Sequence, residues 1–304
     1  MTKISAQLDG VLVLNKPSGP TSARCIAQIK RLGQKKIGHA GTLDPMASGV
    51  LLVLLGQATK ISSWLLAGGG KVYRGTLRLG IMTDTWDAEG RITKESSWEK
   101  VTPESVCAEI ARWRDMKEQP VPPYSAAKHE GRPLYRLARH GLTPAKVKSI
   151  EISQAATLDV SLPLVRFRVV CGSGTYVRSL AHSLGMRLGC GAVLTELTRE
   201  YSYPFGLDAA CDLEAVMKNP DLMAGKLRSI PEALPDWPRI EIASEGAADI
   251  LHGRAIPANG LSGGAAVPGK TMALLIHEGR ALALSRLADG PNGPQWTILR
   301  GLWN

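Results

Sequence analysis

Strict alternation of apolar and polar residues is the feature that most constrains how this chain folds. Residues 71–79 and 164–170 alternate with a period of two, which is typical of strands that bury one face. Residues 50–55 are apolar throughout and predict a strand buried in a core. Apolar residues at helical spacing, with capping residues before them, predict helices over residues 21–32, 102–113 and 176–188. Strands and helices interleave, so residues 1–235 are predicted to form one mixed α/β domain.

The last part of the chain has a different pattern. Residues 231–238 are rich in proline and predict a linker. Beyond them, short strand-like segments are separated by glycine-rich turns, at residues 272–276, 281–285 and 296–300. Residues 239–304 are therefore predicted to form a small, β-barrel-like second domain.

Positive charge is concentrated in one segment. The chain has 37 Lys and Arg against 27 Asp and Glu, a net charge of +10, which favours an anionic partner such as nucleic acid. Residues 117–148 hold seven basic and two acidic residues, together with prolines and tyrosines. This composition predicts an RNA-binding insertion over residues 117–150. The alternative is an ordinary solvated loop and helix.

The cysteines and the apolar runs indicate the cellular compartment of the protein. The five cysteines are scattered without Cys-x-x-Cys spacing, so neither structural zinc nor disulfides are expected. The longest apolar run, residues 50–55, is far shorter than the ~20 residues of a membrane span. No signal-peptide pattern opens the chain. We expect a cytoplasmic protein without a membrane anchor or a metal.

A phosphate-loop motif stands near the C-terminus. Residues 264–271 match G-x-x-x-x-G-K-T, which taken alone indicates an NTPase. A phosphate loop needs a strand before it and a helix after it. Here turn-forming residues precede the motif, and residues 272–280 read as a strand running into a turn. We therefore expect no nucleotide cofactor, and we keep an NTPase as an alternative hypothesis.

Four polar motifs are the candidates for chemistry. The densest is the glycine-rich segment of residues 36–50, which brings a histidine, hydroxyls and Asp44 together ahead of a buried strand. Residues 16–22 precede the first helix, and Lys71-Val72-Tyr73 opens a strand. Arg178 falls in the first turn of a helix, where the helix dipole disfavours a cation. That position predicts a carboxylate partner for Arg178.

In their order along the chain, these motifs resemble the TruB-type tRNA pseudouridine-55 synthases. The resemblance runs from about Val11 to Asp212 and includes residues 83–90 and 122–139. It implies an α/β (α+β) fold with a mixed, largely antiparallel sheet, a basic RNA-binding insertion, and a PUA-like C-terminal barrel. It implies isomerisation of uridine to pseudouridine in the T-loop of tRNA, with base flipping and no cofactor.

The resemblance also assigns site residues. Asp44 corresponds to the nucleophile, Arg178 to its charge partner, and Tyr73 to an aromatic under the uracil whose phenol helps remove the C5 proton. The expected substrate-binding residues are His39, Tyr176, Leu197, Lys16, Gly41 and Thr42. The expected RNA-binding residues of the insertion are Lys128, Arg132, Arg136 and Arg139. The alternative interpretations are a structural histidine for His39 and core packing for Leu197.

Some positions depart from the family pattern. His182 and Ser183 stand where two acidic residues are usual, Thr198 replaces an arginine, and Gly172 replaces a serine. We expect these departures to affect local packing and RNA contacts and to leave the reacting groups intact. A non-catalytic RNA-binding protein or RNA chaperone is the main rival function, because it needs the basic insertion without Asp44. The expected partner is the tRNA T-arm, and the expected state is a monomer.

Overall fold

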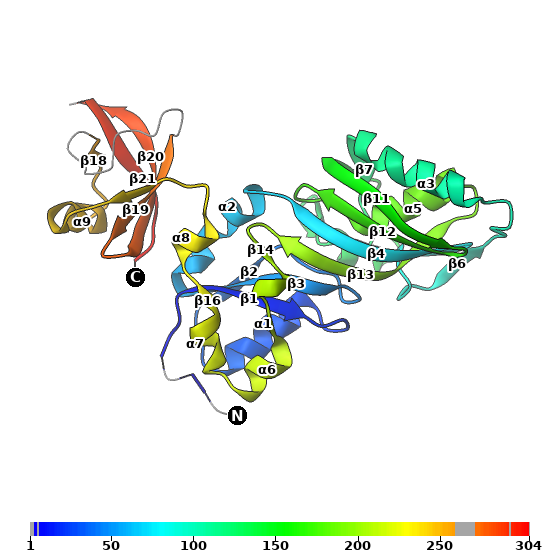
Figure 1. Ribbon diagram of the computed structural model, residues 1–304, viewed down its shortest axis with the longest axis horizontal. Coiled ribbons are helices and arrows are strands. Elements are labelled where there is room, and N and C mark those ends of the chain that lie inside the picture. The colour runs from blue at the N-terminus through cyan, green and yellow to red at the C-terminus, as the bar shows by residue number, and fades with distance from the viewer. Residues whose placement is uncertain (1–2, 5, 259–270, 292, 304) are drawn as a thin grey trace.

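A ten-stranded mixed sheet forms the body of the protein (Figure 1). The structure is a computed structural model, and it describes residues 3–4, 6–258, 271–291 and 293–303. Seven strands follow one another in the sheet: β11 (Ile152–Ser161), β12 (Leu164–Cys171), β4 (Lys71–Leu79), β13 (Ala192–Ser202), β3 (Ser48–Leu55), β1 (Gly10–Lys16) and β15 (Cys211–Asp212). Three short strands pair at its sides: β2 (Ile37–Ala40), β14 (Phe205–Gly206) and β16 (Leu227–Arg228). Most neighbours are antiparallel, whereas β13–β3 and β1–β15 run parallel.

The burial of β4 and β3 follows their sequence patterns. In β4, buried residues alternate with more exposed ones, which confirms the predicted one-faced strand. In β3 both faces are buried, because Leu51 and Val53 belong to one core cluster and Val50 and Leu52 to another. A strand with cores on both sides needs the continuous apolar run seen in the sequence.

Helices cover the sheet where the sequence predicts them. Thr21 caps α1 (Ser22–Arg31), and Thr102 forms a capping box with Ser105 at the start of α3 (Pro103–Ala111). The third predicted helix is α5 (Val177–Arg187), which packs on β13 and α3. The remaining helices before residue 230 are short: α2 (Ser62–Ala67), α4 (Leu134–Ala138), α6 (Leu213–Lys218), α7 (Leu222–Lys226) and the 3-10 turns η1 (Gly56–Ile61), η2 (Arg112–Asp115) and η3 (Leu207–Ala209).

Small two-stranded elements extend from the sheet. One is the ribbon of β5 (Ile81–Thr83) and β6 (Ile92–Glu95), which follows β4 directly. The predicted basic insertion is closed at its base by β7 (Glu118–Pro120) paired with β10 (Val147–Ser149). Within it lie the hairpin of β8 (Lys128–His129) and β9 (Arg132–Pro133) and then α4. The insertion thus leaves the body at β7 and returns to it at the neighbouring strand β10.

The proline-rich linker prediction is wrong in its first half. Ser229 and Glu232 form a capping box that starts α8 (Ile230–Ala233), with Pro231 in its first turn. Ile230, Ala233 and Leu234 are buried in the same core cluster as β1 and β3. Proline favours the first turn of a helix as well as a linker, so composition alone could not separate the two. The connection is therefore confined to residues 235–238.

The C-terminal part is a curled five-stranded sheet, as predicted (Figure 1). Its strands follow in the order β17 (Arg239–Glu241), β19 (Met272–His277), β20 (Arg280–Gly290), β21 (Gly293–Gly301) and β18 (Ile256–Pro257), and α9 (Ser244–Leu251) packs against them. The phosphate-loop motif lies outside the described residues except for Thr271. The element that follows Thr271 is strand β19, whereas a phosphate loop requires a helix there.

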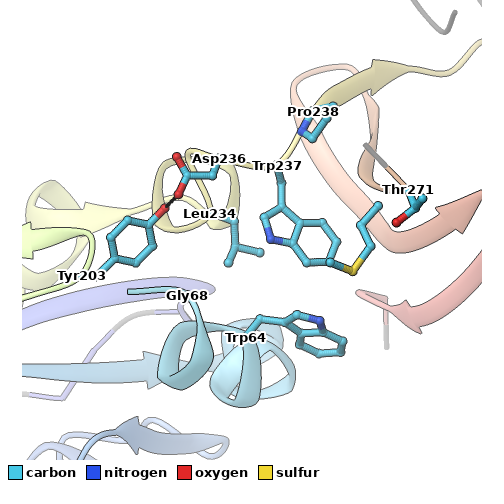
Figure 2. Close-up of a pocket in the computed structure, with 9 residues that line it drawn as sticks. Trp64, Gly68, Tyr203, Leu234, Asp236, Trp237, Pro238 and Thr271 are labelled. Atoms are coloured by element: carbon cyan, nitrogen blue, oxygen red, sulfur yellow. Dashed lines mark hydrogen bonds between the residues drawn. The ribbon is translucent and has the colours of Figure 1, made fainter. Parts of the chain in front are cut away.

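The C-terminal sheet packs against the body through an apolar junction. Leu274, Ile276 and Leu284 share a core cluster with β1 and β3. A cavity of about 310 Å³ lies at this junction. Trp64 and Trp237, two of its lining residues, meet edge to face with ring centres 6.2 Å apart (Figure 2). None of the described helices is long and apolar enough to cross a membrane.

Candidate active site

A cavity of about 350 Å³ opens where the two halves of the sheet separate. β13 pairs with β4 over its length but meets β3 through two residue pairs, Thr198–Ser48 and Arg199–Gly49. The loop after β2 and the turn before α5 line the opening beyond these pairs. The lining residues are His39, Gly41, Thr42, Leu43, Asp44, Leu66, Lys71, Tyr73, Ser125, Ala126, Ser173, Gly174, Thr175, Tyr176, Val177, Leu197 and Arg199.

The loop that carries Asp44 is fixed from behind. The hydroxyl of Ser22, at the start of α1, accepts from the amide of Leu43 and donates to its carbonyl. The ammonium of Lys16 is fully buried and donates to the carbonyls of Pro17, Pro20 and Pro45. Lys16 is thus outside the set of cavity-lining residues, and its contacts hold the Asp44 loop against residues 17–20.

Asp44 and Arg178 form a two-point ion pair at the cavity wall. Arg178 Nε donates to Asp44 Oδ2 at 2.9 Å, and Nη2 donates to Oδ1 at 3.0 Å. The guanidinium also donates to the carbonyls of Thr85 at 2.8 Å and Tyr124 at 3.0 Å. Arg178 is buried, whereas the Asp44 side chain keeps 35% of its surface exposed. The geometry fixes the carboxylate and leaves it open to the cavity.

Asp87 is a second carboxylate beside the same arginine. Its Oδ2 lies 3.6 Å from Arg178 Nε, and its other oxygen accepts from the Thr85 hydroxyl and the Glu89 amide. Burial raises the pKa of Asp87, while the Thr85 hydrogen bond and the Arg178 charge act in the opposite direction. The predicted carboxylate partner of Arg178 is therefore confirmed, and the structure supplies two of them.

Tyr73, Leu197 and Arg199 form the floor of the cavity. Tyr73 of β4 stands directly across from Arg199 of β13 in the sheet register. Arg199 is fully buried and donates to the carbonyls of Val50 and Gly41. Burial raises the pKa of the Tyr73 phenol, with the Arg199 charge opposing that effect. The phenol is therefore protonated at neutral pH.

The other expected substrate-binding residues line the same cavity. His39 faces it from the end of β2, and its Nδ1 is buried without a hydrogen-bond partner among the described residues. Burial lowers the pKa of His39, and the Arg199 charge adds to that effect, so the imidazole is neutral at pH 7. Gly41 and Thr42 present their carbonyls to Arg199. Tyr176 lies at the N-terminal cap of α5.

The four expected RNA-binding residues are exposed on the basic insertion. Lys128 and Arg132 lie on the small hairpin, and Arg136 and Arg139 flank Tyr135 of α4. The guanidinium carbons of Arg136 and Arg139 lie 6.0 and 5.7 Å from the centre of the Tyr135 ring. The insertion borders the cavity through Ser125 and Ala126. These cations therefore extend from the cavity mouth.

Three charged residues of the site were absent from the predicted set: Asp87, Lys71 and Arg199. Arg199 had a usable signal, because it follows Leu197 by two residues on one strand and so shares its face. Lys71 lies in a candidate motif, and Asp87 lies in residues 83–90 of the resemblance. Neither had a role assigned, because a sequence does not tell which charged groups a fold will bury.

The comparisons with known proteins identify the family. Residues 30–177 match the N-terminal domain model of the TruB family pseudouridylate synthases. A tRNA pseudouridine synthase B of Oleidesulfovibrio alaskensis is 58% identical over 303 residues, covering 98% of each chain. The chain belongs to the TruB family. A tRNA pseudouridine synthase B of Nitratidesulfovibrio vulgaris is 54% identical over 316 residues, covering 100% of both proteins.

Solved structures match this TruB-family chain in fold. A chain of the Cbf5-Nop10-Gar1 complex has a TM-score of 0.70 at 24% sequence identity, covering 97% of this chain and 85% of that one. The mixed, largely antiparallel sheet is the pseudouridine synthase fold, and the curled C-terminal sheet is PUA-like. Both expectations of the fold class are confirmed.

Two departures from the TruB pattern have local explanations. His182 stacks on Trp86, with ring centres 4.2 Å apart and planes 4° apart. Trp86 lies between Thr85 and Asp87, so this stack packs behind the Arg178 network. The Thr198 hydroxyl lies 3.0 Å from that of Ser48 at the junction of β13 and β3. Nothing in the structure explains Gly172 or Ser183.

Proposed function

We propose that this TruB-family chain converts the uridine at position 55, in the T-loop of tRNA, to pseudouridine with Asp44 as nucleophile. That it isomerises uridine in tRNA follows from its 58% and 54% identical relatives, both tRNA pseudouridine synthases. The observation that carries the assignment of Asp44 is the two-point pair with buried Arg178, which leaves the carboxylate accessible from the cavity. A charged, oriented and accessible carboxylate is what a nucleophile requires.

The reaction breaks the bond between N1 of uracil and C1′ of ribose, turns the base, and joins C5 to C1′. The hydrogen on C5 is lost and N1 gains one, so no redox partner takes part. Asp44 assists cleavage of the N1–C1′ bond and holds one of the two fragments, the uracil or the ribose, while the base turns. Arg178 keeps the carboxylate oriented throughout, because it also bonds two backbone carbonyls that do not move with the substrate.

Tyr73 supports the base through its ring. The expectation that its phenol removes the C5 proton conflicts with its raised pKa, because a protonated phenol is a poor base at neutral pH. Stacking under uracil is the role that its buried position on β4 favours.

The uridine reaches this cavity by leaving its stack. His39 and Tyr176 face the space that the base would enter, and the basic insertion over residues 117–150 extends from the same mouth. We assign that insertion to the T-arm, bound through shape and phosphate contacts. We assign residues 1–235 to the catalytic domain and residues 239–304 to a second RNA-binding unit, in a monomeric enzyme.

The test is tritium release from a T-arm stem-loop labelled at C5 of its uridines, with no added cofactor. The wild type should release tritium from one T-loop uridine. Asp44→Asn keeps the side-chain shape and removes the charge, so it should bind the RNA and release none. Asp159→Asn, an exposed change on β11 far from the cavity, is the matched control and should react normally.

Two results would contradict the proposal. Normal release by a folded Asp44→Asn protein would exclude Asp44 as nucleophile. Tight binding of the stem-loop by the wild type without release would favour the rival function of an RNA-binding protein without catalysis.

A further inference from the structure

Lys71 is a buried cation that lacks an acidic partner. It opens β4, keeps 7% of its surface exposed, and lines the active-site cavity. Among the described residues no carboxylate lies within ion-pair distance of its ammonium, and no hydrogen bond satisfies it. Lys16 shows the contrast, because it is fully buried and its ammonium donates to three carbonyls. The Lys71 side chain is thus mostly removed from water, and its charge faces a cavity without a counter-charge from the protein.

The groups around Lys71 do not supply the missing negative charge. Burial lowers the pKa of Lys71, and the neighbouring charges of Arg199 and Lys148 act in the same direction. The nearby Cys171 thiol is no counter-ion, because burial raises its pKa to about 11 and keeps it neutral. The Asp44 carboxylate is already bound at two points by Arg178.

Two glycine turns that line the cavity each adjoin a lysine, Gly41 beside Lys71 and Gly174 beside Lys148. A β-carbon on Gly41 would lie 3.5 Å from Lys71 Cε, and a β-carbon on Gly174 would collide with Lys148 Nζ. Both glycines have positive φ and bring backbone close to these lysines. Lys71 is therefore a buried cation of the cavity lining, and Lys148 is an exposed cation beside the Gly174 turn, close enough for its charge to act on Lys71.

We propose that Lys71, with Lys148 beside the Gly174 turn, binds a phosphate of the RNA backbone adjoining the reacting uridine. This rests on the proposed function, because that function brings a flipped nucleotide into the cavity. Uracil is neutral and cannot balance the buried charge, whereas the phosphodiester attached to the same nucleotide carries one negative charge. RNA binding then completes an ion pair between the Lys71 ammonium and the phosphate.

The experiment compares stem-loops in which one phosphate next to the target uridine, on its 5′ or its 3′ side, is replaced by an uncharged methylphosphonate. Equilibrium binding is measured for the wild type, Lys71→Gln, and Lys94→Gln, an exposed control on β6. One of the two replacements should weaken wild-type binding about tenfold, as loss of a charge-assisted contact does. Lys71→Gln should bind the unmodified RNA about tenfold more weakly and show no further loss with that replacement.

Salt dependence is the second readout. Lys71→Gln should lower the slope of log affinity against log salt by about 0.7, the contribution of one neutralised phosphate in single-stranded RNA. The Lys94→Gln slope should equal that of the wild type.

Several outcomes would overturn the proposal. Equal losses from the methylphosphonate in the wild type and in Lys71→Gln would show that Lys71 does not contact that phosphate. If Lys71→Gln fails to fold, the wild type alone decides, because tolerance of both replacements would exclude a phosphate site. Tritium release by the wild type is scored separately, so failure of the proposed function is distinguished from failure of this site.

Discussion

Replacing Arg178 by lysine keeps a positive charge beside Asp44 but removes the planar fork that holds the carboxylate at two points. Arg178 makes four hydrogen bonds, two to Asp44 and one each to the carbonyls of Thr85 and Tyr124. A lysine ammonium is a single point on a flexible stem, so it cannot reproduce the two parallel contacts that fix the plane of the carboxylate. The Asp44 carboxylate is then free to rotate.

The expected effect on rate follows from the lost contact. One charge-assisted hydrogen bond contributes about 1.5–3 kcal/mol, and 1.36 kcal/mol corresponds to tenfold in rate, so Arg178→Lys should slow the chemical step roughly 10- to 150-fold. At least one backbone carbonyl also loses its donor inside the fold. That loss should lower the free energy of unfolding by about 1–3 kcal/mol.

The assay is single-turnover tritium release with saturating enzyme, so that binding does not limit the rate. Arg187→Lys is the matched control, because Arg187 ends the same helix and pairs with Glu109 outside the cavity. The control should react at the wild-type rate. If folded Arg178→Lys reacts within threefold of the wild type, orientation of Asp44 by a two-point pair does not matter for catalysis.

Two further predictions concern stability. Gly49→Ala should lower the free energy of unfolding by about 2–6 kcal/mol, because its β-carbon collides with the Arg199 backbone at φ +104°, whereas Gly19→Ala at φ +106° meets open space and should lose only the strain of about 1–3 kcal/mol. Equal urea midpoints for the two variants would contradict this. Burial lowers the pKa of His182 below 6.5, so the unfolded chain binds a proton that the folded chain does not. The free energy of unfolding should therefore fall as the pH drops below 6.5, by at most about 1.4 kcal/mol per pH unit from this side chain, and His182→Gln should flatten that dependence in urea titrations at pH 5–7.5. An unchanged slope would exclude His182 as the source.

Local patterns predicted the elements of the fold well. The period of β4 and the capping residues of α1 and α3 act within a few residues, so the sequence contains the information. The same holds for Arg178, since a cation in the first turn of a helix requires a partner wherever the helix lies. The prediction of a linker over residues 231–238 was wrong in its first half, because α8 is buried against distant strands.

The site was predictable only where chemistry shows in a short motif. Asp44 stands out in its glycine-rich loop, but nothing local shows that Lys16 faces backbone carbonyls while Lys71 faces a cavity. Both lysines are polar residues of strand ends. Their different environments arise from contacts across the sheet, which a single sequence does not contain. Asp87 was likewise identified by its distance from Arg178 and not by its neighbours.

The pair of Asp44 and Arg178 joins residues 134 positions apart, and Arg199 bonds the carbonyl of Val50 across 149 positions. A growing polypeptide therefore contains Asp44 long before it contains the arginine that orients it. Contacts of such long sequence separation form late, after the local elements. Partly synthesised chains thus lack the ion pair of Asp44 and Arg178, which needs residues from distant parts of the sequence to be in place.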